Sequence, residues 1–259
     1  MRIDQLLVQR GLALTRSQAQ RLIAAGVRWR ADGHWQQVSK NGEQVADDAE
    51  IALLDEAQTR YVSRGGLKLE GALAHRRLPV EGTVCLDLGQ STGGFTDCLL
   101  QAGARHVLGV DVGHGQLDPR LRADPRVSCL EKTNARQLTL DTVRAALPAP
   151  AAGSAFAGFD LVVGDLAFIS QTLVLPAIVP MLRPGGSLLM LVKPQFELAP
   201  GQVGKGGLVR DTALHALVEQ RVRAAHRGLG LAVLDYFDSS IPGGDGNREF
   251  FIHSISAQQ

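Results

Sequence analysis

The sequence is poor in cysteine and lacks the residue patterns that bind metals or build disulfide frameworks. Only three of its 259 residues are cysteines, at Cys85, Cys98 and Cys129, and no C-x-x-C pair occurs. Its seven histidines show no H-x-x-x-H or similar ligand spacing. We therefore expect reduced cysteines in the core of a cytosolic protein, and no bound metal.

Long hydrophobic runs are missing as well. No apolar run approaches the roughly 18–20 residues of a membrane-spanning helix, and the first residues lack the apolar core of a secretory signal. We therefore expect a cytoplasmic protein with no membrane partner. A hydrophobic content of 45% with 20% charged residues is typical of a globular protein.

The formal net charge is only +1, but the charges are unevenly distributed. Residues 1–30 carry six arginines and one acid, whereas residues 31–60 carry two basic and seven acidic residues. A basic face at the N-terminus can therefore exist on a nearly neutral protein, and it would suit an anionic partner. The alternative is an ordinary solvated helix face.

The most informative segment runs from Val84 to Asp97. An apolar, strand-like stretch leads into an acid, then into a glycine-rich turn, then into an amphipathic helix. This pattern is typical of the carboxyl edge of an α/β sheet, where nucleotides bind. Twenty-two positions after Gly89, a second predicted strand ends at Asp111, whose carboxylate can accept hydrogen bonds from ribose hydroxyls. Ser91 replaces the middle glycine of a dinucleotide fingerprint, so a nucleoside without phosphates, such as S-adenosylmethionine, fits better. The alternative is a turn that merely joins strand to helix.

The chain divides into two predicted domains. Residues 1–56 predict a small α+β unit, with a helix over 3–10, a second helix that begins at a capping box on Thr15, and short strands after it. Residues 57–64 read as a polar linker, and strands and helices alternate from residue 65 to residue 259, which predicts a mostly parallel sheet with helices on both faces. The expected strands lie near 83–88, 106–111, 126–131, 159–165, 186–193, 230–237 and 248–255. The expected helices lie near 66–77, 94–103, 134–146, 170–182 and 211–228. The last strand follows a short loop and should run antiparallel.

Five motifs spread along the chain carry a family resemblance. They are Arg64–Leu69, Ser91–Asp97, Asp165–Ser170, Val192–Glu197 and Gly246–Phe250. Together they resemble the TlyA family of ribosomal RNA 2′-O-methyltransferases, which are often labelled haemolysins. Residues 2–30 are similar to the RNA-binding domain of small-subunit ribosomal protein four, which precedes the methyltransferase domain in that family. The resemblance implies a Rossmann-like class I methyltransferase with a seven-stranded, mostly parallel sheet, plus a small N-terminal α+β RNA-binding domain.

The resemblance also implies the site residues. The family's catalytic domain is similar to FtsJ-type methyltransferases with a Lys-Asp-Lys-Glu tetrad, which falls by motif on Lys68, Asp165, Lys193 and Glu249, with Glu197 as an alternative to Glu249. The residues expected to bind S-adenosylmethionine are Asp87, Gly89, Ser91, Thr92, Gly93, Gly94, Phe95, Asp111, Asn134 and Asp165. The arginines at the N-terminus predict contacts with RNA phosphates through Arg2, Arg16, Arg21 and Arg64, with Arg28 as a further candidate.

The chemistry of ribose methylation explains these residue types. A ribose 2′-hydroxyl is a poor nucleophile at neutral pH, so transfer benefits from a base that removes or orients its proton. Lys193 can serve only as a neutral amine, and two positive neighbours, the sulfonium and Lys68, favour that form. Asp165 and Glu249 would hold the lysines in place. The resemblance implies methylation of cytidine in ribosomal RNA, with ribosomal RNA or ribosomal subunits as partners. The alternatives are a membrane-active haemolysin and a non-catalytic RNA-binding protein.

Three features depart from the family pattern. Gln90 occupies a position that is usually small and could alter the fit around the methionine part of the cofactor, and Ala167 stands where serine is usual. The hairpin of residues 28–35 differs from the usual Val-x-Val-Asn-Gly pattern, so the resemblance does not imply RNA contacts in this hairpin.

Overall fold

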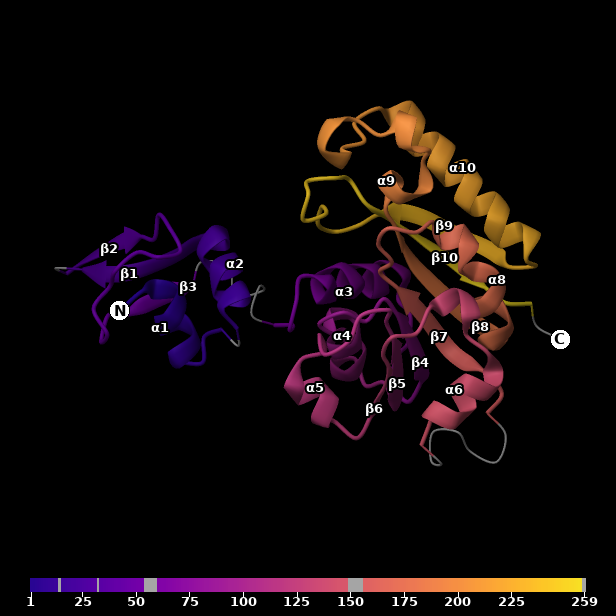
Figure 1. Cartoon of the computed structure of the whole chain (residues 1–259), viewed down its shortest axis with the longest axis horizontal. Helices are drawn as coiled ribbons and strands as arrows, with labels where there is room; N and C mark the ends of the chain where they lie inside the picture. Colours follow the sequence, from indigo (N-terminus) through magenta and orange to yellow (C-terminus); the bar gives the residue numbers. More distant parts are fainter. Residues whose placement is uncertain (14, 32, 54–59, 149–155, 258–259) are drawn as a thin grey trace. The chain divides into compact units, whose positions relative to one another are not determined.

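The computed structural model describes residues 1–13, 15–31, 33–53, 60–148 and 156–257. The chain forms two compact units, Met1–Leu67 and Lys68–Gln259 (Figure 1). Residues 57–59 of the predicted linker lie outside the described residues.

The smaller unit packs two helices against one face of a three-stranded antiparallel sheet. The helices are α1 (Ile3–Gln9) and α2 (Arg16–Gly26), and the sheet has the order β2 (His34–Gln37), β1 (Val27–Ala31), β3 (Ile51–Leu53). The side chain of Thr15 accepts a hydrogen bond from the backbone N–H of Gln18 at 3.1 Å, which is the predicted cap of α2. The helices contribute Leu6, Leu7 and Leu22 to the core of this unit. The two helices and the short strands expected for this segment are confirmed.

The larger unit contains the predicted seven-stranded sheet, in the order β6-β5-β4-β7-β8-β10-β9. Its strands are β4 (Val84–Leu88), β5 (His106–Val110), β6 (Val127–Leu130), β7 (Phe159–Gly164), β8 (Leu182–Val192), β9 (Ala232–Asp238) and β10 (Phe250–Ile255). The pairs from β6 to β8 are parallel, whereas β10 runs antiparallel to both β8 and β9. The mostly parallel sheet and its antiparallel last strand are therefore confirmed.

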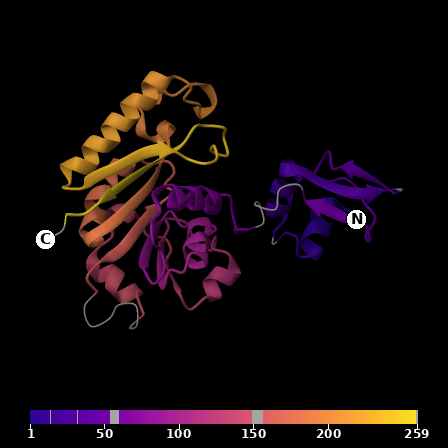
Figure 2. The ribbon, with the colours of Figure 1, turned by 180° about the vertical axis from the view of Figure 1, so that it is seen from behind.

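Helices cover both faces of this sheet (Figure 1 and Figure 2). They are α3 (Gly65–Arg76), α4 (Gly94–Gln101), α5 (Pro119–Ala123), α6 (Leu140–Ala146), α8 (Leu175–Ile178), α9 (Pro194–Glu197) and α10 (Thr212–Gly228). Strand β10 shows the two faces directly, because successive side chains of a strand point to opposite sides. Phe250 and Ile252 join the core that includes α8 and α10, while Phe251 stacks with Phe95 of α4 at 6.3 Å between ring centroids.

Two of the predicted helices are interrupted. Over 134–146, Asn134 caps a short 3-10 turn and Thr139 then caps a separate helix, α6. Over 170–182, the 3-10 turns Gln171–Leu173 and Val179–Met181 flank the four-residue α8. Pro176 and Pro180 explain this break, because proline cannot donate the backbone hydrogen bond of a continuous helix. The prediction of two unbroken helices was wrong in this respect.

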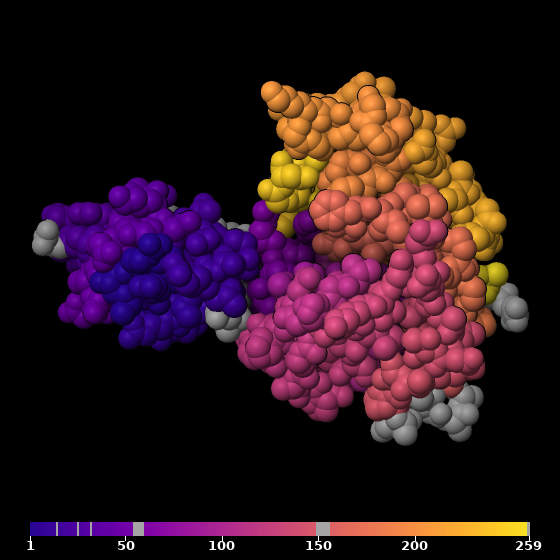
Figure 3. Space-filling view, in the orientation of Figure 1, coloured from indigo at the N-terminus to yellow at the C-terminus, as the bar shows by residue number. Residues whose placement is uncertain are grey.

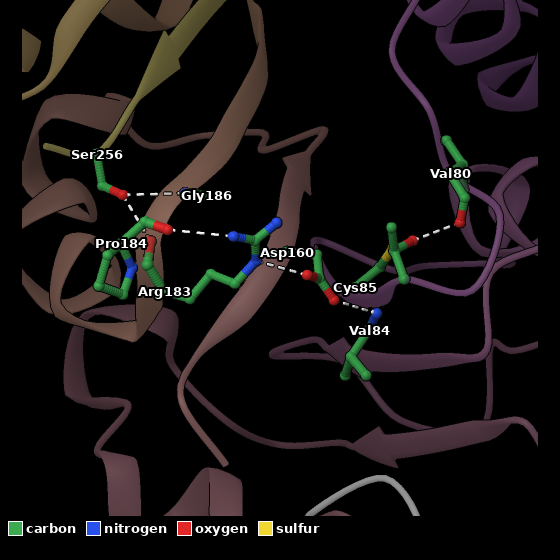
Figure 4. A network of polar contacts seen from close by, with 9 residues as sticks. Val80, Val84, Cys85, Asp160, Arg183, Pro184, Gly186 and Ser256 are labelled. Carbon is green, nitrogen blue, oxygen red and sulfur yellow. Dashed lines mark hydrogen bonds and ion pairs between the residues drawn. The ribbon is translucent and has the colours of Figure 1, made fainter. Parts of the chain in front are cut away.

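A network of polar contacts joins the strands at the edge opposite the glycine turn (Figure 4). Asp160 accepts hydrogen bonds from the backbone N–H of Val84 at 2.8 Å and from Nε of Arg183 at 2.6 Å. The hydroxyl of Ser256 donates to the carbonyl oxygen of Arg183 at 2.6 Å and accepts from the N–H of Gly186 at 3.1 Å. These hydrogen bonds connect residues at the ends of β4, β7, β8 and β10. The candidate functional site lies at the other edge of the sheet, the carboxyl edge.

Candidate active site

Two of the predicted catalytic residues meet at the carboxyl edge of the sheet. Asp165 follows β7 and Lys193 follows β8, and these strands are parallel neighbours. Because parallel strands end at the same edge, the two side chains are brought together. Nζ of Lys193 lies 2.5 Å from Oδ1 of Asp165, and the two side chains are 14% and 23% exposed.

The other two predicted catalytic residues form a second ion pair. Lys68 lies in the first turn of α3 and Glu249 directly precedes β10. Nζ of Lys68 lies 2.6 Å from Oε2 of Glu249, and the two side chains are 9% and 3% exposed. Burial raises the pKa of Glu249, and the negative charge of Asp165 raises it further. The positive charges of Lys68 and Lys193 lower it, but the net shift is upward. The Lys193–Asp165 pair thus lies near enough to act electrostatically on Glu249, and we treat the four charges as one cluster.

Glu197, the alternative to Glu249, is held elsewhere. Its carboxylate accepts hydrogen bonds from the hydroxyl of Ser170 at 2.5 Å and from the backbone N–H of Gln171 at 2.9 Å. The carboxylate therefore caps the 3-10 turn after β7. The structure brings Glu249, and not Glu197, to Lys68.

A cavity of about 510 Å³ opens beside Asp165. In the space-filling view, the salmon segment after β7 lies above the magenta segment after β5, and the surface is hollowed between them (Figure 3). Five of the residues expected to bind the cofactor line this cavity: Gly89, Ser91, Asp111, Asn134 and Asp165. Val112, Leu166, Phe168 and Ile169 add apolar surface, and a volume of this order is typical of small-molecule sites.

The backbone of the turn is shaped to approach this cavity closely. Gly89 adopts φ +76°, and a Cβ at this position would lie 2.6 Å from the carbonyl oxygen of Asp165, so only glycine fits. Ser91 also has a positive φ of 49°. Its backbone N–H donates to Oδ2 of Asp111 at 2.7 Å, and Oδ1 of Asp111 accepts from the N–H of Gly113 at 2.7 Å. The acid after β5 is thereby fixed against the turn.

The other residues of the predicted cofactor set are not among those that line the cavity. Asp87 is fully buried and accepts a hydrogen bond from the hydroxyl of Thr96 at 2.7 Å, and its burial raises the pKa to about 7. Gly93 adopts φ +95° as the N-cap of α4, with Gly94 the first residue of that helix. The carbonyl of Thr92 accepts from the N–H of Asp118, and Phe95 packs on Phe251. These residues shape the turn, and none of them lines the cavity.

Gln90, the first departure from the family pattern, is buried beneath the turn and does not line the cavity. Its amide donates to the hydroxyl of Thr96 at 2.9 Å and accepts from the thiol of Cys129 at 3.0 Å. A Cβ on Gly109 of β5 would lie 1.9 Å from Cδ of Gln90. The larger side chain therefore fills the space that this glycine leaves open.

This packing predicts a strong coupling between Gln90 and Gly109. We expect Gln90→Ala and Gly109→Ala each to lower the free energy of unfolding by about 1–3 kcal/mol, through lost hydrogen bonds in one variant and overpacking in the other. In the double variant the new methyl group occupies vacated space, so the combined loss should fall short of the sum by about 1 kcal/mol or more. Urea unfolding of the four proteins measures this, and strictly additive losses would contradict it.

Phe168 is a cavity residue that the sequence reasoning did not single out. Its side chain is 91% exposed, its φ is +63°, and its ring lies 5.2 Å from that of Phe196 between centroids. A left-handed backbone is an outlier for a bulky residue, and such strain clusters at functional sites. The sequence signal that could have identified Phe168 is an aromatic residue three positions after Asp165, the acid at the end of a predicted strand.

Two glycine-rich segments, residues 194–210, which begin with α9, and the loop of residues 239–247, are joined to each other. Asn247 is buried; its side chain accepts from the N–H of Val209 at 2.9 Å and donates to the carbonyl of Gly207 at 2.9 Å. Gln195 donates to Asp245 at 3.1 Å. These bonds connect the segment after Lys193 to the segment before Glu249, so the two loops hold both ends of the charged cluster.

The arginines expected to bind RNA form two groups within the smaller unit. Arg2 and Arg16 both pair with the fully buried carboxylate of Asp4, at 3.0 Å each. The hydrogen bond from Arg2 is the main cause that lowers the pKa of Asp4 to about 2. Arg21 is partly buried and donates to the carbonyl of Val62 at 3.4 Å; its burial and the nearby Arg64 lower its pKa. Asp4 thus holds Arg2 and Arg16 in place. Arg21 and Arg64, by contrast, are two like charges that lie close together.

The described part of the chain shows neither a metal-binding cluster nor a membrane-spanning helix. No group of three or more His, Cys, Asp or Glu side chains there is arranged to hold a metal ion. None of the helices there is long and apolar enough to cross a membrane.

The fold and site define a class of protein. A parallel sheet with a glycine turn after β4, an acid after β5 and a mostly apolar cavity at the carboxyl edge is the arrangement of a Rossmann-like class I methyltransferase. Comparison with family models agrees, because residues 61–255 match FtsJ-like methyltransferase and residues 1–26 match the S4 domain. The chain belongs to the TlyA group of FtsJ-like methyltransferases.

Individual relatives support this assignment. The chain is 43% identical over 97% of its length to "16S/23S rRNA (cytidine-2'-O)-methyltransferase TlyA" of Mycobacterium tuberculosis, and the match covers 88% of that protein. It is 35% identical to "Hemolysin A" of Brachyspira hyodysenteriae, over 98% of this chain and 100% of that one. A solved structure from Streptococcus thermophilus, described as a hemolysin, aligns with a TM-score of 0.74 at 40% identity and covers 100% of this chain and 90% of that one.

Proposed function

We propose that this protein transfers the methyl group of S-adenosylmethionine to the ribose 2′-hydroxyl of cytidine in ribosomal RNA. The observation that carries the proposal is the cluster of two ion pairs, Lys193–Asp165 and the buried Lys68–Glu249, beside the cavity at the carboxyl edge. The name of the mycobacterial relative states this activity and supports the choice of substrate.

The cavity suits an adenosine-bearing cofactor. Asp111 faces it with a carboxylate that the backbone already orients, and a carboxylate at this position can accept hydrogen bonds from ribose hydroxyls. Val112, Leu166 and Ile169 offer apolar surface for a flat base. Close approach of the backbone is possible at Gly89, where a side chain would collide with Asp165. When bound, S-adenosylmethionine supplies a methyl group that its sulfonium already activates.

Within this site, Lys193 acts on the proton of the ribose hydroxyl. Its Nζ is held 2.5 Å from Asp165, so the amine has a fixed position from which it can orient or accept that proton. The reaction forms an O–CH₃ bond at the 2′-oxygen and breaks the S–CH₃ bond. For the hydroxyl proton to move to Lys193, the ammonium first gives up its own proton, either to Asp165, with which it is paired, or to solvent. The Lys68–Glu249 ion pair adds to the electrostatic stabilisation of the cluster. Holding the groups in line contributes much of the remaining acceleration.

RNA is bound through both charge and stacking. Arg2 and Arg16, organised by Asp4, present guanidinium groups that can contact phosphates, and Arg21 and Arg64 add positive charge to the same unit. The exposed ring of Phe168 at the rim of the cavity offers a stacking surface for the target base. The substrate is thus ribosomal RNA, free or within a ribosomal subunit, and the protein acts in the cytoplasm, where these substrates are found.

Methyl transfer from labelled cofactor to separate ribosomal subunits tests the proposal. We expect label in RNA, a reverse-transcription stop at one or a few cytidines, and resistance of those positions to alkaline cleavage, because a methylated 2′-oxygen cannot attack its phosphate. Label on a base would overturn the 2′-O assignment. Cofactor binding without any transfer to either subunit or to free ribosomal RNA would favour a non-catalytic RNA-binding protein.

A further inference from the structure

The sheet of the smaller unit has one face that its helices do not cover. Val27 and Trp29 of β1, with Ile51 and Leu53 of β3, belong to or pack against the core formed with α1 and α2. Residues on a strand alternate between faces, so Arg28 and its neighbours point to the opposite side. This opposite side is called the outer face below.

The strand register identifies the residues of the outer face. Arg28 lies opposite Gln37, and Arg30 lies opposite Trp35. Directly opposed residues of an antiparallel pair share a face and lie close enough to act together. All four side chains are exposed, and Trp35 is 44% exposed. The outer face therefore presents two arginines beside an exposed indole.

The charges on this face are available to a ligand. The backbone of Arg28 is paired within the sheet, but its side chain has no ion pair or hydrogen bond among the residues that the structure describes. Arg30 pairs with Glu50 at 3.2 Å, but both side chains are more than half exposed. Such surface pairs are held weakly, so the guanidinium of Arg30 can exchange Glu50 for a phosphate.

We propose that the outer face binds an unpaired segment of the RNA substrate, with a base stacked on Trp35 and the flanking phosphates on Arg28 and Arg30. Guanidinium groups next to an aromatic platform are the elements with which proteins bind single strands. A paired helix would use the arginines but not the indole, because its bases are stacked on each other. The inference rests on the proposed function and adds a second RNA contact, since the matched S4 segment ends at residue 26, before β1 begins.

The outer face lies apart from Arg2 and Arg16. Arg2 precedes α1 and Arg16 opens α2, and both are tied to Asp4 on the helical side of the unit. RNA held by both groups would contact the unit on two sides. The hairpin that departs from the family pattern is then the part that gives this chain its own additional contact.

Equilibrium binding by the full-length protein tests the proposal with two probes, a short unstructured polycytidine RNA and a blunt RNA duplex. We expect Trp35→Ala to weaken binding of the single strand about 5- to 100-fold and to leave duplex binding unchanged, in line with the alanine-substitution cost of base stacking. Trp35→Phe should restore most of the affinity. The double variant Arg28→Ala/Arg30→Ala should reduce the slope of log K against log salt by about 1–2, because two phosphate contacts are lost.

Two outcomes separate this inference from the proposed function. If the wild-type protein methylates ribosomal RNA while Trp35→Ala binds both probes like the wild type, the outer face is not an RNA site and the function stands. If Trp35→Ala weakens duplex and single strand equally, the stacking contact is refuted. Circular dichroism melting confirms that each variant is folded, which we expect because the substituted side chains are exposed.

Discussion

Replacing Lys193 by alanine is expected to abolish methyl transfer while leaving the protein folded. The variant loses the group that orients or accepts the hydroxyl proton, and positioned bases contribute about 10²–10⁴-fold to such reactions. Asp165 remains at the site and its side chain is partly exposed, so water can solvate the unpaired carboxylate. Single-turnover transfer of labelled methyl groups to ribosomal RNA measures the loss, and calorimetry should show that the cofactor still binds.

Two further variants make this result specific. Lys193→Arg keeps the positive charge, but a guanidinium stays protonated in proteins, so this variant should be as inactive as the alanine variant. Lys205→Ala removes an exposed lysine from the loop that follows and should keep the wild-type single-turnover rate at saturating protein. An active Lys193→Arg protein would show that positive charge, and not proton transfer, is what this position supplies.

The assembly of the site could be predicted where strand topology determines it. Alternating strands and helices place Asp165 and Lys193 at neighbouring strand ends, and the structure brings these two side chains into contact. Lys68 and Glu249 are 181 positions apart in the sequence, and their expected role came from the family resemblance alone. Their contact depends on how α3 packs beside the start of β10, which periodicity does not specify.

Other features depend on which way a side chain points, and sequence patterns predict this poorly. Asp87 was expected at the cofactor, but it belongs to a strand buried on both faces, and its carboxylate turns to Thr96 of α4. Gln90 belongs to the turn, but its side chain lies beneath the turn. It fills the space left open at Gly109 and forms hydrogen bonds with Thr96 and Cys129. The helices predicted over 134–146 and 170–182 failed for a local reason that was visible in the sequence. Capping residues and prolines within an apolar pattern interrupt a helix even where the spacing of the apolar residues predicts a continuous one.

Removing Lys68 is expected to expose how strongly the buried carboxylate of Glu249 depends on its partner. In Lys68→Met, Glu249 is left buried without its nearest positive charge, and breaking such a pair costs about 3–5 kcal/mol. Burial already raises the pKa of Glu249 in the folded protein, and loss of Lys68 raises it further. An acid with a raised folded-state pKa destabilises the folded state as pH rises through that pKa, because the unfolded chain ionises more easily. The stability gap between wild type and variant should therefore be small near pH 4.5 and wide at pH 8 in urea unfolding.

A compensating variant tests whether the uncompensated charge is the cause. Lys68→Met/Glu249→Gln carries no charge at either position, so it should recover most of the lost stability at pH 8 and lose the pH-dependent gap. It should nevertheless transfer no methyl groups, because half of the charged cluster is gone. If Lys68→Met is equally destabilised at both pH values, or if the double variant is no more stable at pH 8, the damage comes from lost packing of the lysine stem and the pair does not bear the electrostatic role assigned to it.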